Sequence, residues 1–198
     1  TMEISGLLMK TCDVVLATGG PGVVKAAYSS GKPSYGVGAG NVQCILDEDV
    51  DYAKVVPMII DGRCFDNGII CSGEQNAITP ASKVDELVAE YKKNHGVLID
   101  DPAQVDALRS AMFPGGVMNK DLVGQSALKV AAAAGIDVPE DTRVLLVKAP
   151  AYGKDDYFSE EKMCPVMALY TYDTWDEAIA IADANLSVAG RGHSVAIH

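Results

Sequence analysis

Hydrophobic and polar positions along the chain follow two periods, one typical of β-strands and the other of amphipathic α-helices. Apolar runs such as DVVLAT, VQCIL and PVMALYTY have the length of buried strands, and longer helical segments lie between them. Strands are predicted at residues 13–18, 42–46, 76–79, 143–148, 165–172 and 193–197. Helices are predicted at 2–11, 23–29, 52–63, 83–93, 103–112, 126–134 and 175–185.

The alternation of these helices and strands predicts the fold class. It is typical of an α/β domain built on a mostly parallel open sheet with helices on both faces. The chain has 198 residues, of which 48% are hydrophobic, so it can bury one sizeable core or two small ones. The opening helix, strand and glycine turn are typical of part of a larger nucleotide-binding sheet, and the chain stops at a predicted strand. We therefore expect an excised part of a larger protein.

The charge of the chain narrows its range of partners. It has 27 acidic and 16 basic residues, and its formal net charge is −11. A nucleic acid is not an expected partner, because phosphate binding requires clustered Lys and Arg. A membrane is not expected either, because no apolar run approaches the roughly 20 residues of a membrane span. No signal-peptide pattern is visible at the N-terminus, so a cytoplasmic location is predicted.

The cysteines exclude two kinds of stabilising site. There are five of them, Cys12, Cys44, Cys64, Cys71 and Cys164, and none forms a C-x-x-C pair. An odd number of scattered cysteines argues against a disulfide framework and against a structural zinc site. No metal site is therefore predicted.

A glycine turn follows the first predicted strand in DVVLATGGPGVVKAA. Gly19, Gly20 and Gly22 stand between a strand and a helix, where backbone N–H groups can meet an anion or a cofactor. The spacing is not G-x-G-x-x-G, and a tight structural turn explains the glycines equally well. A second run, YGVGAGN, contains Gly38 and is also explained by close backbone packing.

Cys71 differs from the other cysteines in its surroundings. Cys12, Cys44 and Cys64 lie in or beside apolar segments and are interpreted as buried fillers. Cys71 in FDNGIICSGEQ follows the expected sharp turn Asp66-Asn67-Gly68 and precedes Ser72-Gly73. Irregular backbone here leaves its N–H available to an oxyanion that forms when the thiolate attacks a carbonyl. A nucleophilic role for Cys71 is one hypothesis, and a buried structural thiol is the other.

Four stretches together resemble the CoA-acylating aldehyde dehydrogenases: ATGGPGVVKAAYSSGKPSYGVGAGN, FDNGIICSGEQ, EEKMCPV and GRGHSVAIH. This branch of the aldehyde dehydrogenase superfamily includes the aldehyde half of the bifunctional aldehyde-alcohol dehydrogenases and the acylating succinate-semialdehyde dehydrogenases. The resemblance runs over nearly the whole chain, with the stretches in the expected order.

The resemblance implies a reaction and roles for named residues. Cys71 matches the catalytic cysteine, which attacks an aldehyde to give a thiohemiacetal. The thiohemiacetal carbon then passes a hydride to NAD (NADP is possible), which leaves a thioester on the cysteine until coenzyme A removes the acyl group. Glu161 falls where the superfamily has a glutamate that contacts the nicotinamide ribose. Met163 and Cys164 replace the aromatic residue and the glycine usual in that motif, which weakens the match there. Gly19, Gly20, Gly22 and Gly38 become candidate cofactor-binding residues.

One departure from the superfamily separates acylating from hydrolytic chemistry. Hydrolytic members carry an E-L-G-G glutamate that activates water, and the matching stretch 34–38 has no acid. A thiol needs less help from a base than water does, so the acyl group is left for coenzyme A. His193 in GRGHS is the candidate helper, with a hydrogen-bonded strand-end histidine as the alternative. A hydrolytic aldehyde dehydrogenase and a non-catalytic scaffold remain alternative functions.

The resemblance also implies how the chain is organised. Residues 1–33 match the C-terminal piece of the NAD-binding domain, and 34–198 match the catalytic domain. The rest of the parent chain, a small aldehyde and coenzyme A are the expected partners, and the parent is expected to be a homo-oligomer. Residues 1–198 alone are expected to be inactive. Arg63 is a candidate for binding a substrate carboxylate, with an interaction with its own helix dipole as the alternative.

Overall fold

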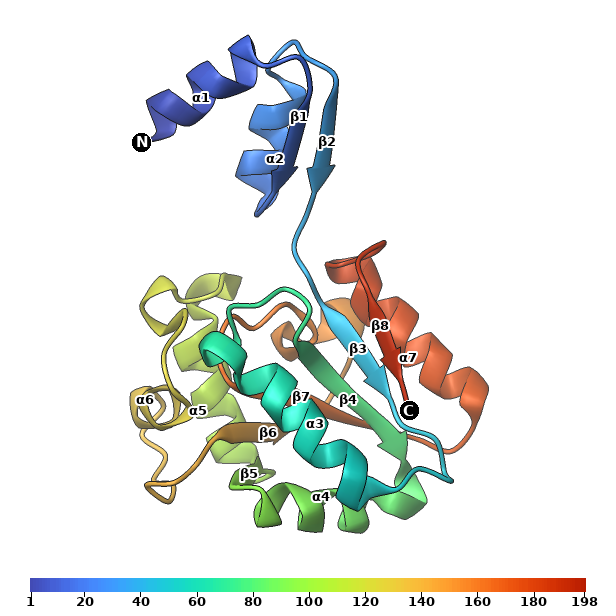
Figure 1. Cartoon of the computed structure of the whole chain (residues 1–198). Coiled ribbons are helices and arrows are strands. Elements are labelled where there is room, and N and C mark those ends of the chain that lie inside the picture. Colours follow the sequence, from blue (N-terminus) through green and yellow to red (C-terminus); the bar gives the residue numbers. More distant parts are fainter. The chain divides into compact units, whose positions relative to one another are not determined.

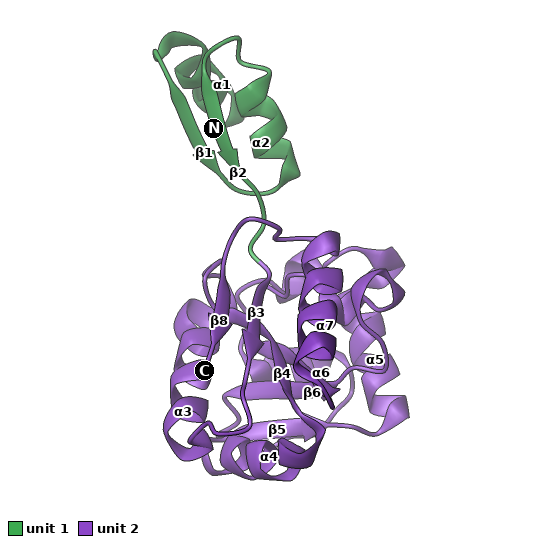
Figure 2. Ribbon diagram, turned by 90° about the vertical axis from the view of Figure 1, so that its right-hand side faces the viewer, with its two compact units in different colours: residues 1–40 green, residues 41–198 purple.

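The computed structural model describes residues 1–198, which form two compact units, Thr1–Gly40 and Asn41–His198 (Figure 2). The first unit has one buried cluster of apolar side chains, and the second unit has two.

The first unit is a small βαβ arrangement preceded by a helix (Figure 1). Its elements are α1 (Met2–Thr11), β1 (Val15–Thr18), α2 (Pro21–Tyr28) and β2 (Ser34–Val37). The two strands pair in parallel and α2 connects them. Its core is small, with Val15, Ala17 and Ala27 buried. Leu16, on the other face of β1, is 77% exposed, so that face of the strand pair packs against nothing within the unit.

The second unit is built on a six-stranded sheet in the order β5-β6-β7-β4-β3-β8, and every neighbouring pair is parallel (Figure 1). The strands are β3 (Val42–Ile45), β4 (Glu74–Pro80), β5 (Gly96–Ile99), β6 (Val144–Lys148), β7 (Val166–Tyr172) and β8 (Val195–Ile197). The helices are α3 (Tyr52–Cys64), α4 (Val84–Lys93), α5 (Pro102–Met112), α6 (Ala127–Ala133) and α7 (Trp175–Val188). Short 3₁₀ turns lie at Phe65–Gly68, Ala81–Lys83, Pro114–Gly116, Lys120–Leu122, Gly153–Asp155 and Tyr157–Ser159.

Alternating residues of each strand point to opposite faces of this sheet and enter two different cores. On β6, Leu145 and Val147 face one cluster, while Val144 and Leu146 face the other. The first cluster includes residues of α5, α6 and α7, and the second includes residues of α3 and α4. Helices therefore cover both faces, which explains why the strands are apolar throughout rather than alternating.

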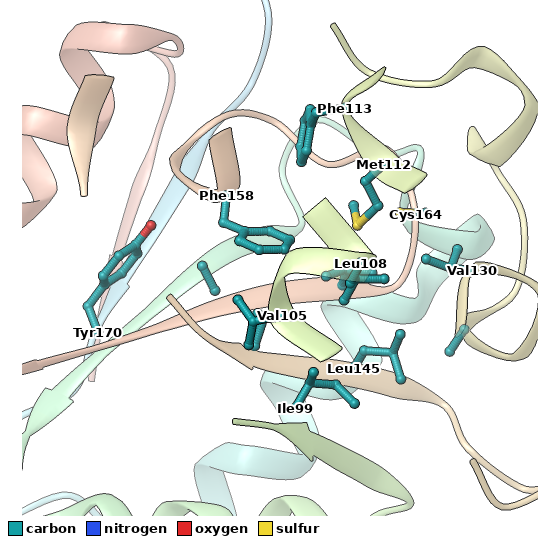
Figure 3. Packing of buried hydrophobic residues seen from close by; sticks show 14 of the residues in the cluster. Ile99, Val105, Leu108, Met112, Phe113, Val130, Leu145, Phe158, Cys164 and Tyr170 are labelled. Carbon is teal, nitrogen blue, oxygen red and sulfur yellow. The ribbon is translucent and has the colours of Figure 1, made fainter. Parts of the chain in front are cut away.

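Figure 3 shows the first cluster, where residues of α5 pack onto the sheet. Leu108 and Met112 are fully buried and lie over Leu145 of β6. Phe158 lies edge-on to Phe113, with ring centroids 6.1 Å apart. Burying a side chain of this size contributes about 1.5–3 kcal/mol, so this cluster is a major source of stability.

The predicted fold class is confirmed, and so are the predicted helices and strands, with ends that shift by one to three residues. Two strands escaped prediction. β2 (Ser34–Val37) and β5 (Gly96–Ile99) have only four residues each and contain or begin with glycine, which weakens the strand pattern.

The boundary between the units differs from the expected one at residue 33. The first unit ends at Gly40, because β2 pairs with β1 from Ser34 to Val37. The close packing expected for the YGVGAGN run occurs at Gly36, where an added Cβ would lie 2.7 Å from Val24 Cγ1 and 2.9 Å from Tyr28.

None of the helices combines the length and the apolar character that crossing a membrane requires.

Candidate active site

The chain segments that bear Cys71, Glu161 and His193 meet at one edge of the sheet. Cys71 precedes β4, Glu161 precedes β7 and His193 precedes β8. All three strands are parallel, so their amino ends lie on the same side of the sheet. Neighbouring strands are about 4.8 Å apart, which places these strand starts within about 15 Å of one another.

The loop before Cys71 is a left-handed turn. Asp66, Asn67 and Gly68 have φ angles of 49°, 52° and 77° in succession. Two of these residues carry a Cβ, and the left-handed conformation costs such residues about 1–2 kcal/mol each. Gly68 cannot be replaced without a clash, because an added Cβ would lie 2.7 Å from the carbonyl of Cys164. The sharp turn expected at this point is therefore confirmed, and it brings the Cys71 loop against the segment that follows Glu161.

Cys71 itself lies in irregular backbone and is half-buried. Its backbone N–H donates no hydrogen bond within the protein, whereas Gly73 N–H donates to Ile70 at 3.1 Å. A partly accessible thiol beside a free N–H has the two features that nucleophilic attack on a carbonyl requires, a nucleophile and a donor to the developing oxyanion.

Arg63 lies at the end of α3 and is fully buried, with none of its side chain exposed. Its guanidinium donates to the carbonyls of Gly68 at 2.8 Å, Cys164 at 2.7 Å and Glu74 at 3.4 Å, and also to the carbonyl of Lys162. None of these acceptors belongs to α3. The guanidinium is therefore inaccessible to a substrate carboxylate, and that expectation for Arg63 is wrong. Arg63 does lie in the last turn of α3, as the alternative requires, although its hydrogen bonds go to other segments.

Lys162 is the second buried cation beside these loops. Its ammonium donates to Phe158 O at 2.6 Å, Glu160 O at 2.8 Å and Asn76 Oδ1 at 3.2 Å. Burial, reinforced by the nearby Arg63 guanidinium, lowers the pKa of Lys162 to about 7. Since Lys162 follows Glu161 directly, its three hydrogen bonds hold the backbone on both sides of that residue.

A buried amide network joins the starts of β3 and β4 to the segment before β8. Asn41 Nδ2 donates to the carbonyls of Ser159, Asn185 and Ala189 at 2.7, 3.3 and 3.2 Å. Gly190 lies against Asn41, and an added Cβ there would be 2.6 Å from Asn41 Cβ. His193 N–H donates to Gly190 O at 3.0 Å, so the backbone that bears His193 is held by this network.

The predicted site residues in the second unit are similarly exposed, since Cys71 is also half-buried. Glu161 and His193 are half-buried, and His193 Nδ1 lies 2.8 Å from Ser194 Oγ. Both side chains retain access to solvent, as contact with a cofactor or a substrate requires.

The predicted glycine turn lies in the first unit. Gly19 and Gly20 connect β1 to α2, whose first helical residue is Pro21. No side chain caps this helix, and of its first three residues Pro21 has no N–H and Val23 N–H donates to Gly20 O at 3.0 Å, so Gly22 N–H is the one without an acceptor. Gly22 is exposed within the first turn of α2, and Gly38 is exposed just after β2.

Of the three cysteines interpreted as buried fillers, only Cys44 is fully buried, whereas Cys12 and Cys64 are half-buried. Cys44 and Cys164 are completely buried, and burial raises the pKa of both thiols, that of Cys164 to about 11. Cys64 is half-buried, its Sγ lies 3.3 Å from Arg143 O, and burial raises its pKa as well.

Sequence reasoning missed the buried polar residues that support these loops. From the sequence, Gln43 and Asn76 are only members of predicted strands, and no pattern assigns a role to Asn41 or Lys162. The available signal was the presence of amide side chains inside runs that are otherwise apolar, since such groups are buried only when they are hydrogen-bonded.

Curated relatives resemble the chain over its whole length. It is 47% identical, over 196 residues, to a protein named succinate-semialdehyde dehydrogenase (acetylating) from Clostridium kluyveri, covering 99% of this chain and 43% of the relative. It is 39% identical to an aldehyde-alcohol dehydrogenase of Clostridium acetobutylicum, covering all of this chain and 23% of the relative. The chain thus spans less than half of each relative. No known protein-family profile matches it.

Solved structures give the same result for the fold. An acetylating aldehyde dehydrogenase from Geobacillus thermoglucosidasius superposes with a TM-score of 0.94 at 40% identity, covering all of this chain and 44% of that one. A Rhodopseudomonas palustris propionaldehyde dehydrogenase, solved with bound CoA and an acylated cysteine, gives 0.87 at 31% identity, covering all of this chain and 45% of that one. The resemblance to the CoA-acylating aldehyde dehydrogenases is therefore confirmed, and homologues of this kind carry the same fold.

Proposed function

We propose that this chain is the cysteine-bearing part of a CoA-acylating aldehyde dehydrogenase, which interconverts aldehyde, CoA and NAD with acyl-CoA and NADH. The observation that carries the proposal is the meeting of the Cys71, Glu161 and His193 segments at one edge of a parallel sheet. The similarity of the whole chain to acylating enzymes supports it.

Cys71 is the proposed nucleophile. Its thiolate attacks the carbonyl carbon of the aldehyde, and the oxygen, which becomes negative, accepts a hydrogen bond from the free backbone N–H of Cys71. Loss of a hydride from the resulting thiohemiacetal leaves an acyl thioester on Cys71. The CoA thiol then attacks that thioester, Cys71 leaves as a thiolate, and acyl-CoA is released.

NAD supplies the hydride acceptor when it is bound. Glu161, whose segment is fixed by Lys162, is the proposed cofactor contact of the second unit. The turn formed by Gly19, Gly20 and Gly22 is proposed separately, as a cofactor-binding turn of the first unit. The start of α2 fits such a ligand, because the N–H of Gly22 there has no acceptor within the protein. Gly38 is a further proposed cofactor-binding residue. NADP stays an alternative cofactor to NAD, because no acidic residue can be assigned to a ribose hydroxyl.

His193 is proposed to assist the CoA step. It lies at the amino end of the edge strand β8, with its ring half-buried and one ring nitrogen bonded to Ser194. A histidine with one free ring nitrogen can accept the thiol proton as CoA attacks.

The organisation of the full protein is part of the proposal. Residues 1–33, together with β2, are proposed to complete a larger NAD-binding sheet, which is supported by the exposed apolar face of β1. The rest of the parent chain is the expected partner, and the parent is proposed to be a cytoplasmic homo-oligomer. Acetaldehyde and succinate semialdehyde represent the proposed substrate class.

One assay on the full-length protein tests the proposal. NADH formation from acetaldehyde and from succinate semialdehyde is measured with and without CoA, and the product is identified by mass spectrometry. Acyl-CoA as the product supports the proposal, whereas a free acid formed at the same rate without CoA would establish the hydrolytic alternative. Absence of NADH formation with both aldehydes contradicts the proposal. The non-catalytic scaffold is then the remaining alternative function.

A further inference from the structure

Arg63 is buried without a carboxylate partner. No Asp or Glu side chain forms an ion pair with it, and every hydrogen bond of its guanidinium ends on a backbone carbonyl. Burying a cation costs free energy that carbonyl dipoles offset only when their geometry is good. The burial of Arg63 therefore depends on where its carbonyl acceptors lie.

The acceptors lie on both sides of Cys71 and directly after Glu161. Gly68 is three residues before Cys71, and Glu74 is three residues after it. Lys162 and Cys164 follow Glu161 in the segment that leads into β7. A single rigid side chain thus holds the loop of the proposed nucleophile against the loop of the proposed cofactor contact.

Two features of the chain fit this contact. The left-handed turn at Asp66, Asn67 and Gly68 ends with the Gly68 carbonyl, which accepts a hydrogen bond from the Arg63 guanidinium. The absent side chain of Gly68 leaves room for both the guanidinium of Arg63 and the carbonyl of Cys164. The planar fork of arginine donates in several fixed directions, which the compact ammonium of lysine cannot reproduce.

We infer that Arg63 is a positioning residue, which fixes the Cys71 loop relative to the Glu161 loop and so sets the approach of the thiohemiacetal to the nicotinamide. The inference rests on the proposed function. Arg63 touches neither substrate nor cofactor, and it acts through the two loops that it joins.

The test compares Arg63→Lys with Gly68→Ala in the full-length protein. The first variant keeps the charge and removes the fork, and the second keeps Arg63 and pushes the loops apart. Both are expected to lower kcat about 10- to 100-fold per active site, because a displacement of about 1 Å at the reacting atoms has an effect of that size. The KM for the aldehyde should change little, and the kinetic isotope effect with the C1-deuterated aldehyde should rise as hydride transfer becomes rate-limiting.

Arg143→Lys is the matched control. Arg143 also bonds to α3 near the end of that helix, where its guanidinium donates to Asp61 Oδ1 at 2.6 Å. In contrast to Arg63, both of these side chains are exposed. Its replacement should leave kcat and the isotope effect unchanged. Active sites are counted by the amount of iodoacetamide that Cys71 takes up, so that loss of folded protein is not mistaken for loss of rate.

Three results would overturn the inference. They are an unchanged kcat per active site in both variants, a lowered kcat with an unchanged isotope effect, and failure of both variants to fold, which would make Arg63 a structural residue only. If the wild-type protein oxidises no aldehyde, the proposed function fails separately. The alkylation rate of Cys71 in the same variants then decides whether Arg63 positions the loop. A rate equal to that of the wild type would refute the positioning role of Arg63 as well.

Discussion

The amide nitrogen of Asn76 donates a hydrogen bond of 3.0 Å to the amide oxygen of Asn41, both fully buried at the starts of neighbouring strands. Asn41 uses its own amide nitrogen to bind three carbonyls from the segments before β7 and β8. One side chain therefore contributes to fixing both the Glu161 and the His193 segments.

Replacing Asn41 with Asp should destabilise the protein strongly. The change turns a donor to three carbonyls into an acceptor, so the carbonyls lose their partner and face a buried negative charge. The expected loss in the free energy of unfolding is about 3 kcal/mol or more, since unsatisfied buried groups cost about 1–3 kcal/mol each and charged groups more. Urea denaturation measures it, with Gln104→Glu on the exposed face of α5 as the control. A loss below about 1 kcal/mol would contradict the assigned network.

Lys162 should make stability depend on pH above neutrality. Its pKa is lowered to about 7 in the folded protein, while in the unfolded chain it returns to about 10.4. Between these values the unfolded chain binds the extra proton, so this residue's contribution to the free energy of unfolding rises with pH. The rise is at most about 1.4 kcal/mol per pH unit, and below pH 7 both states are protonated and the contribution is constant.

The measurement is a comparison of the wild-type protein with Lys162→Met at several pH values between 6 and 10. Their difference in unfolding free energy should be flat below pH 7 and grow in favour of the wild type above it. Lys148→Met, on an exposed residue at the end of β6, serves as the control. A difference that stays constant over the whole range would show that Lys162 keeps its proton.

Gly190 and Gly192 form a matched pair for testing the support of His193. Their φ angles are 89° and 88°, so alanine is strained to the same degree at both. A Cβ added at Gly190 would clash with Asn41, whereas a Cβ added at Gly192 would have no atom within 4 Å. Gly192→Ala should cost about 1 kcal/mol of unfolding free energy from backbone strain alone, and Gly190→Ala about 2 kcal/mol more from the clash. Equal losses would place Gly190 away from Asn41.

The five cysteines should differ in their reactivity with iodoacetamide. Cys71 is half-buried in a loop and should react first at pH 8, whereas Cys44 and Cys164 are fully buried and should react only on unfolding. Raised thiol pKa values slow Cys64 and Cys164 further, because the thiolate is the reactive form. Peptide mapping by mass spectrometry after short exposure gives the order, and equal labelling of all five thiols would favour a non-catalytic scaffold.

Replacing His193 with Ala should separate the two halves of the proposed reaction. Hydride transfer does not require His193, so the first burst of NADH should keep its amplitude in stopped-flow experiments on the full-length protein. The steady-state rate with CoA should fall about 100-fold, the usual size of a general-base contribution. His95→Ala, which removes an exposed histidine bonded to Asp141, is the control. A steady-state rate equal to that of the wild type would remove His193 from the mechanism.

Periodicity predicted most of the element order, because the fold follows from which positions are apolar. Val144–Val147 are apolar without alternation, which predicts a strand at Arg143–Lys148, and α6 and α3 lie on the two faces of the sheet there. Cys71 was also found from the sequence, since its turn residues are local to it. The four-residue strands β2 and β5 were missed because they are short and contain or begin with glycine, and pairing with a neighbour decides whether such a segment is a strand.

The roles of the buried polar residues follow from contacts between distant parts of the chain. Arg63 bonds to Cys164, which is 101 residues away, and Asn41 bonds to Ser159, which is 118 residues away. A buried charge or amide is stable only where distant carbonyls converge on it, and no local pattern records that convergence. The sequence therefore determined which residue is the candidate nucleophile, while the fold decided what holds its loop in place.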